Sequence, residues 1–301
     1  MGASTGDRWA GVRAEYEGWL SRQPLSANTK RAYRTRVSQY LEYLEGTPAG
    51  YGDPLKDPHA RDYAARDFKA HLKTVRRVRP SSVNLSLAAV DSFYRSMGMG
   101  KPDAKREDLP SIAPGALLPE DQKRFLRAVE RSTSARDRAI ARVLFFAGLR
   151  VSELVGLDNA DVAVSARKGR VIVRSGKGDA YREVALNAEV RGALEGWLAD
   201  RKEEYPNPDG EALFLNRKGG RLSGRAVDLI VRRFGDEAAI EKPVSAHVLR
   251  HTCMTNLVRA GNDLVLVAEI AGHKRLETTR RYSLPSEADR QAAMENIRVE
   301  Y

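Results

Sequence analysis

Apolar residues recur every three or four positions along most of the chain, which is the period of an amphipathic helix. Between residues 8 and 97 this pattern predicts four helices. The second is the clearest, and its apolar face is formed by Tyr33, Val37, Tyr40, Leu41 and Leu44. The fourth carries apolar residues at steps of four and three between Val83 and Met97. We therefore expect the first third of the chain to be helical.

The second part of the chain mixes two periods. Short apolar runs at 162–164, 171–173 and 181–186 predict strands, the last two joined as a hairpin. Helical patterns lie before and after them, for example at 135–147 and 245–259. The predicted fold class is mainly α with a small antiparallel β-sheet.

One segment, residues 101–116, contains three prolines, directly follows Gly98 and Gly100, and has no apolar period. We interpret it as an interdomain linker. It separates a helical domain (1–100) from a mixed α/β domain (117–301). The second domain is predicted to end in a short amphipathic helix at 286–297. A chain of 301 residues is long enough to build two cores.

The formal net charge of +11 indicates a polyanionic partner, because lysines and arginines that neutralise phosphates release condensed counterions. Basic side chains cluster on predicted helices and beside a helix start, where backbone N–H groups favour phosphate. The candidate DNA contacts are Lys30, Arg31, Arg34, Arg76, Arg77, Arg79, Arg225, Arg232 and Arg233. A solvated basic surface is the alternative interpretation of these residues.

Composition also excludes several classes of protein. The single cysteine, Cys253, cannot form an internal disulfide or a multi-cysteine zinc site. No signal-peptide pattern and no run of about 18 apolar residues occurs, so we expect a cytoplasmic protein with no membrane partner. No P-loop, GxGxxG or GxSxG motif is present either.

The most specific pattern lies in residues 245–283. His247, Arg250 and His251 fall on one face of a predicted helix. His273 follows a helix-ending glycine, and Tyr282 comes nine residues later, after two arginines, where a core aromatic is not expected. Each residue alone is commonplace, but the set HxxRH, GH and TTxxYS in this order is not.

These residues resemble the second half of the active-site signature of the tyrosine recombinase (phage integrase) family, in its two-domain Xer-like form. The first half of the signature is resembled by residues 147–154 (AGLRVSEL), which contain Arg150. Residues 175–178 (SGKG), which contain Lys177, lie where the family carries a lysine in a turn. The resemblance implies a helical core-binding domain, a mixed α/β catalytic domain and a tyrosine nucleophile, Tyr282. It also implies a 3′-phosphotyrosyl DNA intermediate, which conserves bond energy and needs no ATP.

The residue types suit this chemistry. A phosphodiester gains negative charge during attack, and guanidiniums such as Arg150 and Arg250 can stabilise that charge with two donors each. His247 and His273 can donate or exchange protons, and Lys177 is the candidate acid for the leaving oxygen. Glu153, three residues after Arg150, could orient it. We expect no metal and no other cofactor, because the spaced carboxylates of a two-metal nuclease are absent.

The resemblance implies double-stranded DNA with paired recombination sites as the partner, and a tetramer of the protein on two sites. Two alternatives stay open, a type IB topoisomerase that nicks and reseals DNA and a non-catalytic DNA-binding protein of the same fold. The terminal helix could dock on its own protomer or on a neighbour. The sequence does not indicate the target DNA or the biological role.

Overall fold

The computed structural model describes residues 5–47, 50, 52–109, 115–174, 181–206, 210–273, 275–284, 291, 294 and 295. The chain divides into two compact units, Met1–Pro110 and Ser111–Tyr301. No helix among the described residues is both long enough and apolar enough to span a membrane.

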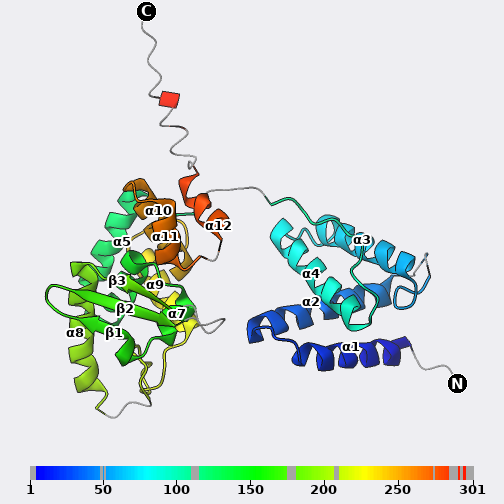
Figure 1. Ribbon diagram of the computed structural model, residues 1–301, viewed down its shortest axis with the longest axis horizontal. Coiled ribbons are helices and arrows are strands. Elements are labelled where there is room, and N and C mark those ends of the chain that lie inside the picture. The colour runs from blue at the N-terminus through cyan, green and yellow to red at the C-terminus, as the bar shows by residue number, and fades with distance from the viewer. Residues whose placement is uncertain are drawn as a thin grey trace, which may run out of the picture. The chain divides into compact units, whose positions relative to one another are not determined.

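The first unit is helical, as predicted (Figure 1). Its helices are α1 (Thr5–Ser21), α2 (Ala27–Gly46), α3 (Pro58–Thr74) and α4 (Pro80–Ser96). Ser26 caps α2 by accepting a hydrogen bond from the backbone N–H of Thr29. Aromatic rings from all four helices contribute to the core. The buried hydroxyls of Tyr40 and Tyr94 lie 2.7 Å apart and form a hydrogen bond.

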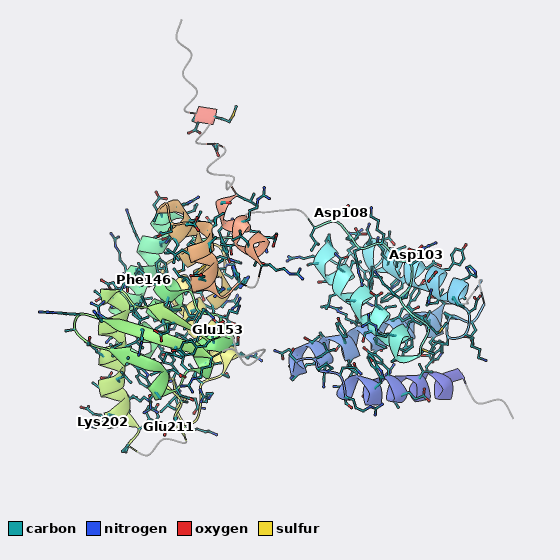
Figure 2. All side chains as sticks on the ribbon, in the orientation of Figure 1. Asp103, Asp108, Phe146, Glu153, Lys202 and Glu211 are labelled. Carbon is teal, nitrogen blue, oxygen red and sulfur yellow. The ribbon has the colours of Figure 1, made fainter. Side chains whose placement is uncertain are left out.

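Residues 101–109 pack against this helical unit, although the sequence pattern assigns them to a linker. Glu107 forms ion pairs with Lys69 and Lys73 of α3 at 2.8 and 2.9 Å. Asp103, which is labelled in Figure 2 beside α3, pairs with Arg66. These contacts are polar and specific to position, so a search for apolar periodicity does not detect them.

The second unit begins with helices and continues into a small sheet. Its helical elements are α5 (Pro119–Arg131), α6 (Ala135–Arg142), the π-helical turn η1 (Val143–Ala147), α7 (Val151–Gly156), the 3₁₀ turn η2 (Asn159–Asp161), α8 (Ala188–Glu204), α9 (Gly224–Glu237), α10 (Ala246–Arg259), α11 (Leu264–Ala271), α12 (Leu276–Arg280) and the 3₁₀ turn η3 (Arg281–Ser283). The core of the unit is formed mainly by apolar residues of α5, α6, η1, α8 and α9.

The sheet has the order β1 (Val162–Val164), β2 (Gly169–Arg174) and β3 (Tyr181–Ala185), with both pairs antiparallel. In the register Val171 opposes both Val162 and Val184, so one apolar face is continuous across the strands. Figure 1 shows α10, α11 and α12 gathered at one end of the unit, with α11 in contact with β3. The mainly α fold class with a small antiparallel sheet is confirmed.

A sharp turn follows η1. Gly148 has a left-handed backbone (φ 61°), and a Cβ there would lie 2.4 Å from Met254 Cε of α10. Only glycine fits both restrictions. The chain therefore leaves the core in close contact with α10 and starts α7 one turn later, with Arg150 at its N-cap position.

Candidate active site

Helix α10 carries three of the predicted site residues. Ser245 caps its start, and Leu249 and Cys253 point into apolar clusters of the unit. His247, Arg250 and His251 lie on another face and line a cavity of about 390 Å³. The residues around this cavity are Arg150, Val151, Ser152, Ala246, His247, Arg250, His251, His273, Thr278, Arg281 and Tyr282. The structure thus brings together five of the six predicted catalytic residues.

Arg250 is almost completely buried, with 3% of its surface exposed. Its guanidinium donates to two main-chain oxygens, Nη1 to Gly148 O at 2.6 Å and Nη2 to Ala271 O at 2.5 Å. Burial, assisted by the positive charge of Arg150, lowers the pKa of Arg250 to about 10, so the group remains cationic at neutral pH. Arg250 therefore joins α10 to the start of α7 and to the end of α11.

Arg150 is held by Glu153, as its spacing suggested. The Arg150 backbone N–H donates to Glu153 Oε2 at 2.8 Å, and Nη1 donates to Glu153 Oε1 at 2.7 Å. Its side chain is still 41% exposed, whereas that of Glu153 is 9% exposed. Nη2 donates to Gly272 O at 3.2 Å. The carboxylate and this main-chain oxygen thus hold the guanidinium on the cavity wall.

Glu153, labelled in Figure 2, also binds Arg182 of β3. Arg182 Nη1 and Nη2 donate to the two carboxylate oxygens at 3.0 and 2.8 Å, and Nε donates to Ile270 O at 3.0 Å. Burial alone would raise the pKa of Glu153, but hydrogen bonds from Arg182 and from the Arg150 backbone outweigh it and lower that pKa to about 2.

Sequence reasoning missed Arg182, although the strand pattern contained a signal. Residues 182, 184 and 186 share one face of a strand, and Val184 and Leu186 are buried there. A charged side chain on that face needs a buried partner. Arg281 was also missed, and it lines the cavity next to the tyrosine.

His273 follows Gly272, which ends α11 with a left-handed backbone (φ 62°). Arg250 Nη2 lies 3.1 Å from His273 Nε2, and because a guanidinium can only donate, Nε2 accepts this hydrogen bond. The proton is therefore on Nδ1, 2.8 Å from Thr279 Oγ1. Burial and the charges of Arg250 and Arg150 lower the pKa of His273 to about 4, in agreement with this neutral form.

Tyr282 is more buried than its arginine neighbours suggested, with 6% of its surface exposed. The ring packs in a small apolar cluster with Met254 and Val267, while the hydroxyl lies 3.0 Å from His251 Nδ1. Burial raises the pKa of Tyr282, although the charges of nearby Arg250 and Arg281 act in the opposite direction. The phenol is thus protonated and placed with its oxygen at the cavity.

The two histidines of α10 lie with their ring centroids 4.0 Å apart. Burial and the neighbouring Arg250 and Arg281 lower the pKa of His247. Burial, His247 and Arg281 lower the pKa of His251 to about 4. Both rings are therefore neutral near pH 7 and can exchange protons. Two guanidiniums, neutral imidazoles and a phenol around one opening suit a reaction at an anionic phosphate.

Comparison with known proteins agrees with this geometry. The sequence pattern of the phage integrase family matches residues 116–288. The chain belongs to the phage integrase family.

Its relatives in this family are recombinases. Tyrosine recombinase XerC of Roseiflexus castenholzii is 34% identical over 273 residues, which cover 86% of this chain and 83% of the relative. Tyrosine recombinase XerA of Thermococcus kodakarensis is 32% identical over 278 residues, which cover 90% of each protein. The family resemblance is confirmed, and the chain is a tyrosine-type site-specific recombinase.

The fold is also similar to that of a solved site-specific recombinase. The crystal structure of XerH recombinase bound to palindromic difH substrate, a post-cleavage complex, matches with a TM-score of 0.73 and 23% identity. The match covers 89% of this chain and 79% of XerH.

Two predictions for this recombinase lie outside the described residues. Lys177 belongs to the segment between β2 and β3, and the terminal helix predicted at 286–297 belongs mostly to the end of the chain. Within the described part, no group of three or more His, Cys, Asp or Glu side chains could hold a metal ion.

The predicted DNA contacts differ in their present partners. Arg31, Arg34, Arg76, Arg77 and Arg79 of the first unit are exposed, as are Arg225, Arg232 and Arg233 on α9, whereas Lys30 is half-buried and donates to Ser21 O at 2.6 Å. Arg34 lies 3.5 Å from Glu17. Arg233 is bound to Asp137 at 2.8 Å and packs over the Phe234 ring.

The basic segment 76–79 lies directly before the start of α4. Helix α4 begins at Pro80 with Arg79 as its N-cap, so Ser81 and Ser82 belong to its first turn instead of capping it. The proline favours this start because its fixed φ fits the first helical position and its missing N–H leaves no donor unpaired.

Proposed function

We propose that this recombinase cuts and rejoins double-stranded DNA at paired sites through a 3′-phosphotyrosyl intermediate on Tyr282. The observation that carries the proposal is the cavity in which Tyr282, Arg150, Arg250, His247 and His273 meet. A scissile phosphate in this cavity would face cationic donors on one side and the nucleophile on the other.

The arginines would stabilise the charge that develops on the phosphate. Arg150 has the exposed guanidinium and would supply the first pair of donors. Arg250 now donates to His273 Nε2, and a phosphate oxygen is a stronger acceptor that would replace this nitrogen. His273 and His247 would then be available to bind the same phosphate.

Lys177 is the proposed acid that protonates the leaving 5′ oxygen. Strand β2 ends at Arg174 and β3 begins at Tyr181, so Lys177 belongs to the segment that joins them. The neighbouring Arg182 is bound to Glu153, which also holds Arg150. This ion pair supports the proposal because it joins the start of β3, a few residues after Lys177 in the chain, to the phosphate-binding side chains.

The DNA contacts and the assembly are part of the same proposal. Helix α9, with Arg225, starts beside α7, where Gly224 approaches the cavity residue Val151. Arg225 and the exposed arginines of the first unit would bind backbone phosphates. XerH has been crystallised on its difH substrate, and we propose that this chain likewise acts on paired DNA sites, as a tetramer, in the cytoplasm where its substrate lies.

The proposal is tested by trapping the covalent intermediate. Genomic DNA from the source organism is incubated with the protein, quenched with detergent, and the protein-linked fragments are sequenced to give the cleavage site. Nicked duplexes of that site should then accumulate a covalent adduct in the presence of EDTA. Tyr282→Phe keeps the buried ring but should give no adduct.

Tyr181→Phe is the matched control, because Tyr181 is exposed and its hydroxyl binds Glu183 on the same strand. It should form the adduct at the normal rate. Absence of an adduct with every DNA tested would contradict the proposal. Strand exchange between two sites, rather than relaxation of supercoils alone, would separate recombination from topoisomerase activity.

A further inference from the structure

The hydroxyl of Tyr282 has a specific neighbour, His251, which belongs to the HxxRH pattern but has been given no chemical role so far. Its oxygen lies 3.0 Å from Nδ1 of His251, and the two ring centroids are 5.5 Å apart. His251 is one turn of α10 beyond His247 and lines the same cavity. A nucleophile and a base within hydrogen-bond reach form the usual geometry for proton removal.

The other two histidines are placed less well for this task. His273 stacks on the Tyr282 ring, with centroids 6.0 Å apart and planes 3° from parallel, and among the described residues no hydrogen bond joins its nitrogens to the hydroxyl. Those nitrogens are also engaged with Arg250 and Thr279. His247 contacts the ring of His251, and among the described residues no hydrogen bond joins it to Tyr282.

The surroundings of His251 keep it neutral, and a neutral imidazole has one nitrogen that can accept. Burial and positive neighbours lower its pKa to about 4. The titratable and charged groups that face it are His247 and Arg250 of α10, His273 after α11, and Arg281 and Tyr282 of η3. With its proton on Nε2, Nδ1 is free to accept from the phenol.

We propose that His251, and not His247, is the general base that removes the proton of Tyr282 during DNA cleavage; this inference rests on the proposed function. As the Oη–P bond forms and the P–O5′ bond breaks, the phenol proton passes to His251 Nδ1. The leaving 5′ oxygen takes a separate proton from the acid. On resealing, the imidazolium returns its proton to the departing Tyr282 oxygen, so the cycle closes without net change.

The test compares His251→Asn with His247→Asn in single-turnover cleavage of the nicked duplex. The Oδ1 of asparagine can take the position of Nδ1 and accept the hydrogen bond, but it cannot hold the proton. Loss of a general base should slow adduct formation about 10²-fold in His251→Asn. Thermal unfolding of both variants shows whether each is folded.

A lower pKa of the nucleophile separates proton removal from mere positioning. Tyr282 is replaced by 3,5-difluorotyrosine, whose phenol loses its proton more easily and depends less on a base. This replacement should raise the cleavage rate of His251→Asn by at least about tenfold, because a more acidic phenol compensates for the missing general base. It should not restore the rate of His247→Asn.

Several results would overturn the inference. Restoration in His247→Asn alone would make His247 the base, and equal restoration in both variants, or in neither, would remove His251 from that role. A cleavage rate of His251→Asn within about threefold of normal would also remove His251 from that role, because loss of a general base should slow the reaction far more. If the unmodified protein forms no adduct, the proposed function itself fails.

Discussion

The two arginines of the cavity differ in what else they hold. Arg250 is buried and binds two main-chain oxygens that have lost their access to water. Arg150 is partly exposed and binds one main-chain oxygen, Gly272 O, at 3.2 Å. Glu153 keeps a second arginine when Arg150 is removed. The two residues should therefore contribute equally to catalysis but unequally to stability.

Alanine substitution at each position tests this difference. Both Arg150→Ala and Arg250→Ala should lower the cleavage rate by about 10²-fold to 10³-fold, the usual effect of losing one charge-stabilising donor. Only Arg250→Ala should lower the free energy of unfolding substantially, by about 1–3 kcal/mol, because it leaves buried carbonyls unpaired. Urea denaturation measures the second quantity, and equal losses in both variants would contradict the assignment.

Gly148 offers a test of the turn between η1 and α7. Gly148→Ala should lower the free energy of unfolding by at least about 2 kcal/mol, because the left-handed backbone and the Met254 side chain both oppose a Cβ. It should also reduce cleavage, since its carbonyl holds Arg250. The control is Gly192→Ala in α8, where nothing lies within 4 Å and stability should rise by about 0.5–1 kcal/mol.

Local sequence patterns predicted most of the residues that line the site but missed the contacts that hold those residues in place. The helical period put His247, Arg250 and His251 on one face, and the structure brings them to one cavity. The ion pair between Glu153 and Arg182 joins residues 29 positions apart, so no local spacing predicts it. The burial of Tyr282 likewise depends on Met254 and Val267, which fold over it from other helices.

Among the secondary-structure elements that do not line the cavity, β3 is joined to the site residues by Arg182. Arg182 connects β3 to Glu153 of α7 and to the last turn of α11 through Ile270 O. Residues of three elements meet at this one guanidinium. Its removal should therefore disturb the phosphate-binding arginines although Arg182 does not line the cavity.

Breaking this pair should be visible in the pH dependence of stability. Because the pKa of Glu153 is lowered to about 2, its stabilising contribution is complete above about pH 4.5 and is lost as the pH falls toward 2. Glu153→Gln should be less stable than the unchanged protein at pH 7. The difference between their denaturation midpoints should narrow between pH 4.5 and pH 3; a constant difference would mean that the carboxylate charge is not responsible.

The secondary-structure elements also show which features the sequence pattern predicts and which it does not. Helix positions follow from apolar period and capping residues, as Ser26 and Ser245 illustrate. The π-helical turn of η1 does not, because five successive apolar residues, Val143–Ala147, are compatible with any buried helix. Its widened turn depends on how α10 packs against it, which is a tertiary contact.

The molecule as a whole consists of two units. Polar contacts extend the first unit beyond its last helix. Ala104 is buried in the helical core, and Arg106 binds Asp91 of α4 at 2.5 Å. We propose that the folded first domain ends near residue 110 instead of residue 100. The apolar period ends earlier because residues 103, 106 and 107 are anchored by charge and hydrogen bonds.

Two fragments measure this boundary. The fragment 1–110 should fold by itself and unfold at a higher temperature than the fragment 1–100, which lacks the partners of Lys69, Lys73 and Asp91. Addition of salt should reduce the difference, since exposed ion pairs are screened. Equal melting temperatures would show that residues 101–110 act only as a connection.

The most direct measurement of the central claim is the identity of the amino acid that becomes joined to DNA. Trapped adducts are digested with nuclease and trypsin, and the nucleotide-bearing peptide is sequenced by mass spectrometry. Our account predicts a nucleotide joined through its 3′ phosphate to Tyr282, the first residue of the tryptic peptide 282–290. Attachment to another residue, or through a 5′ phosphate, would contradict it.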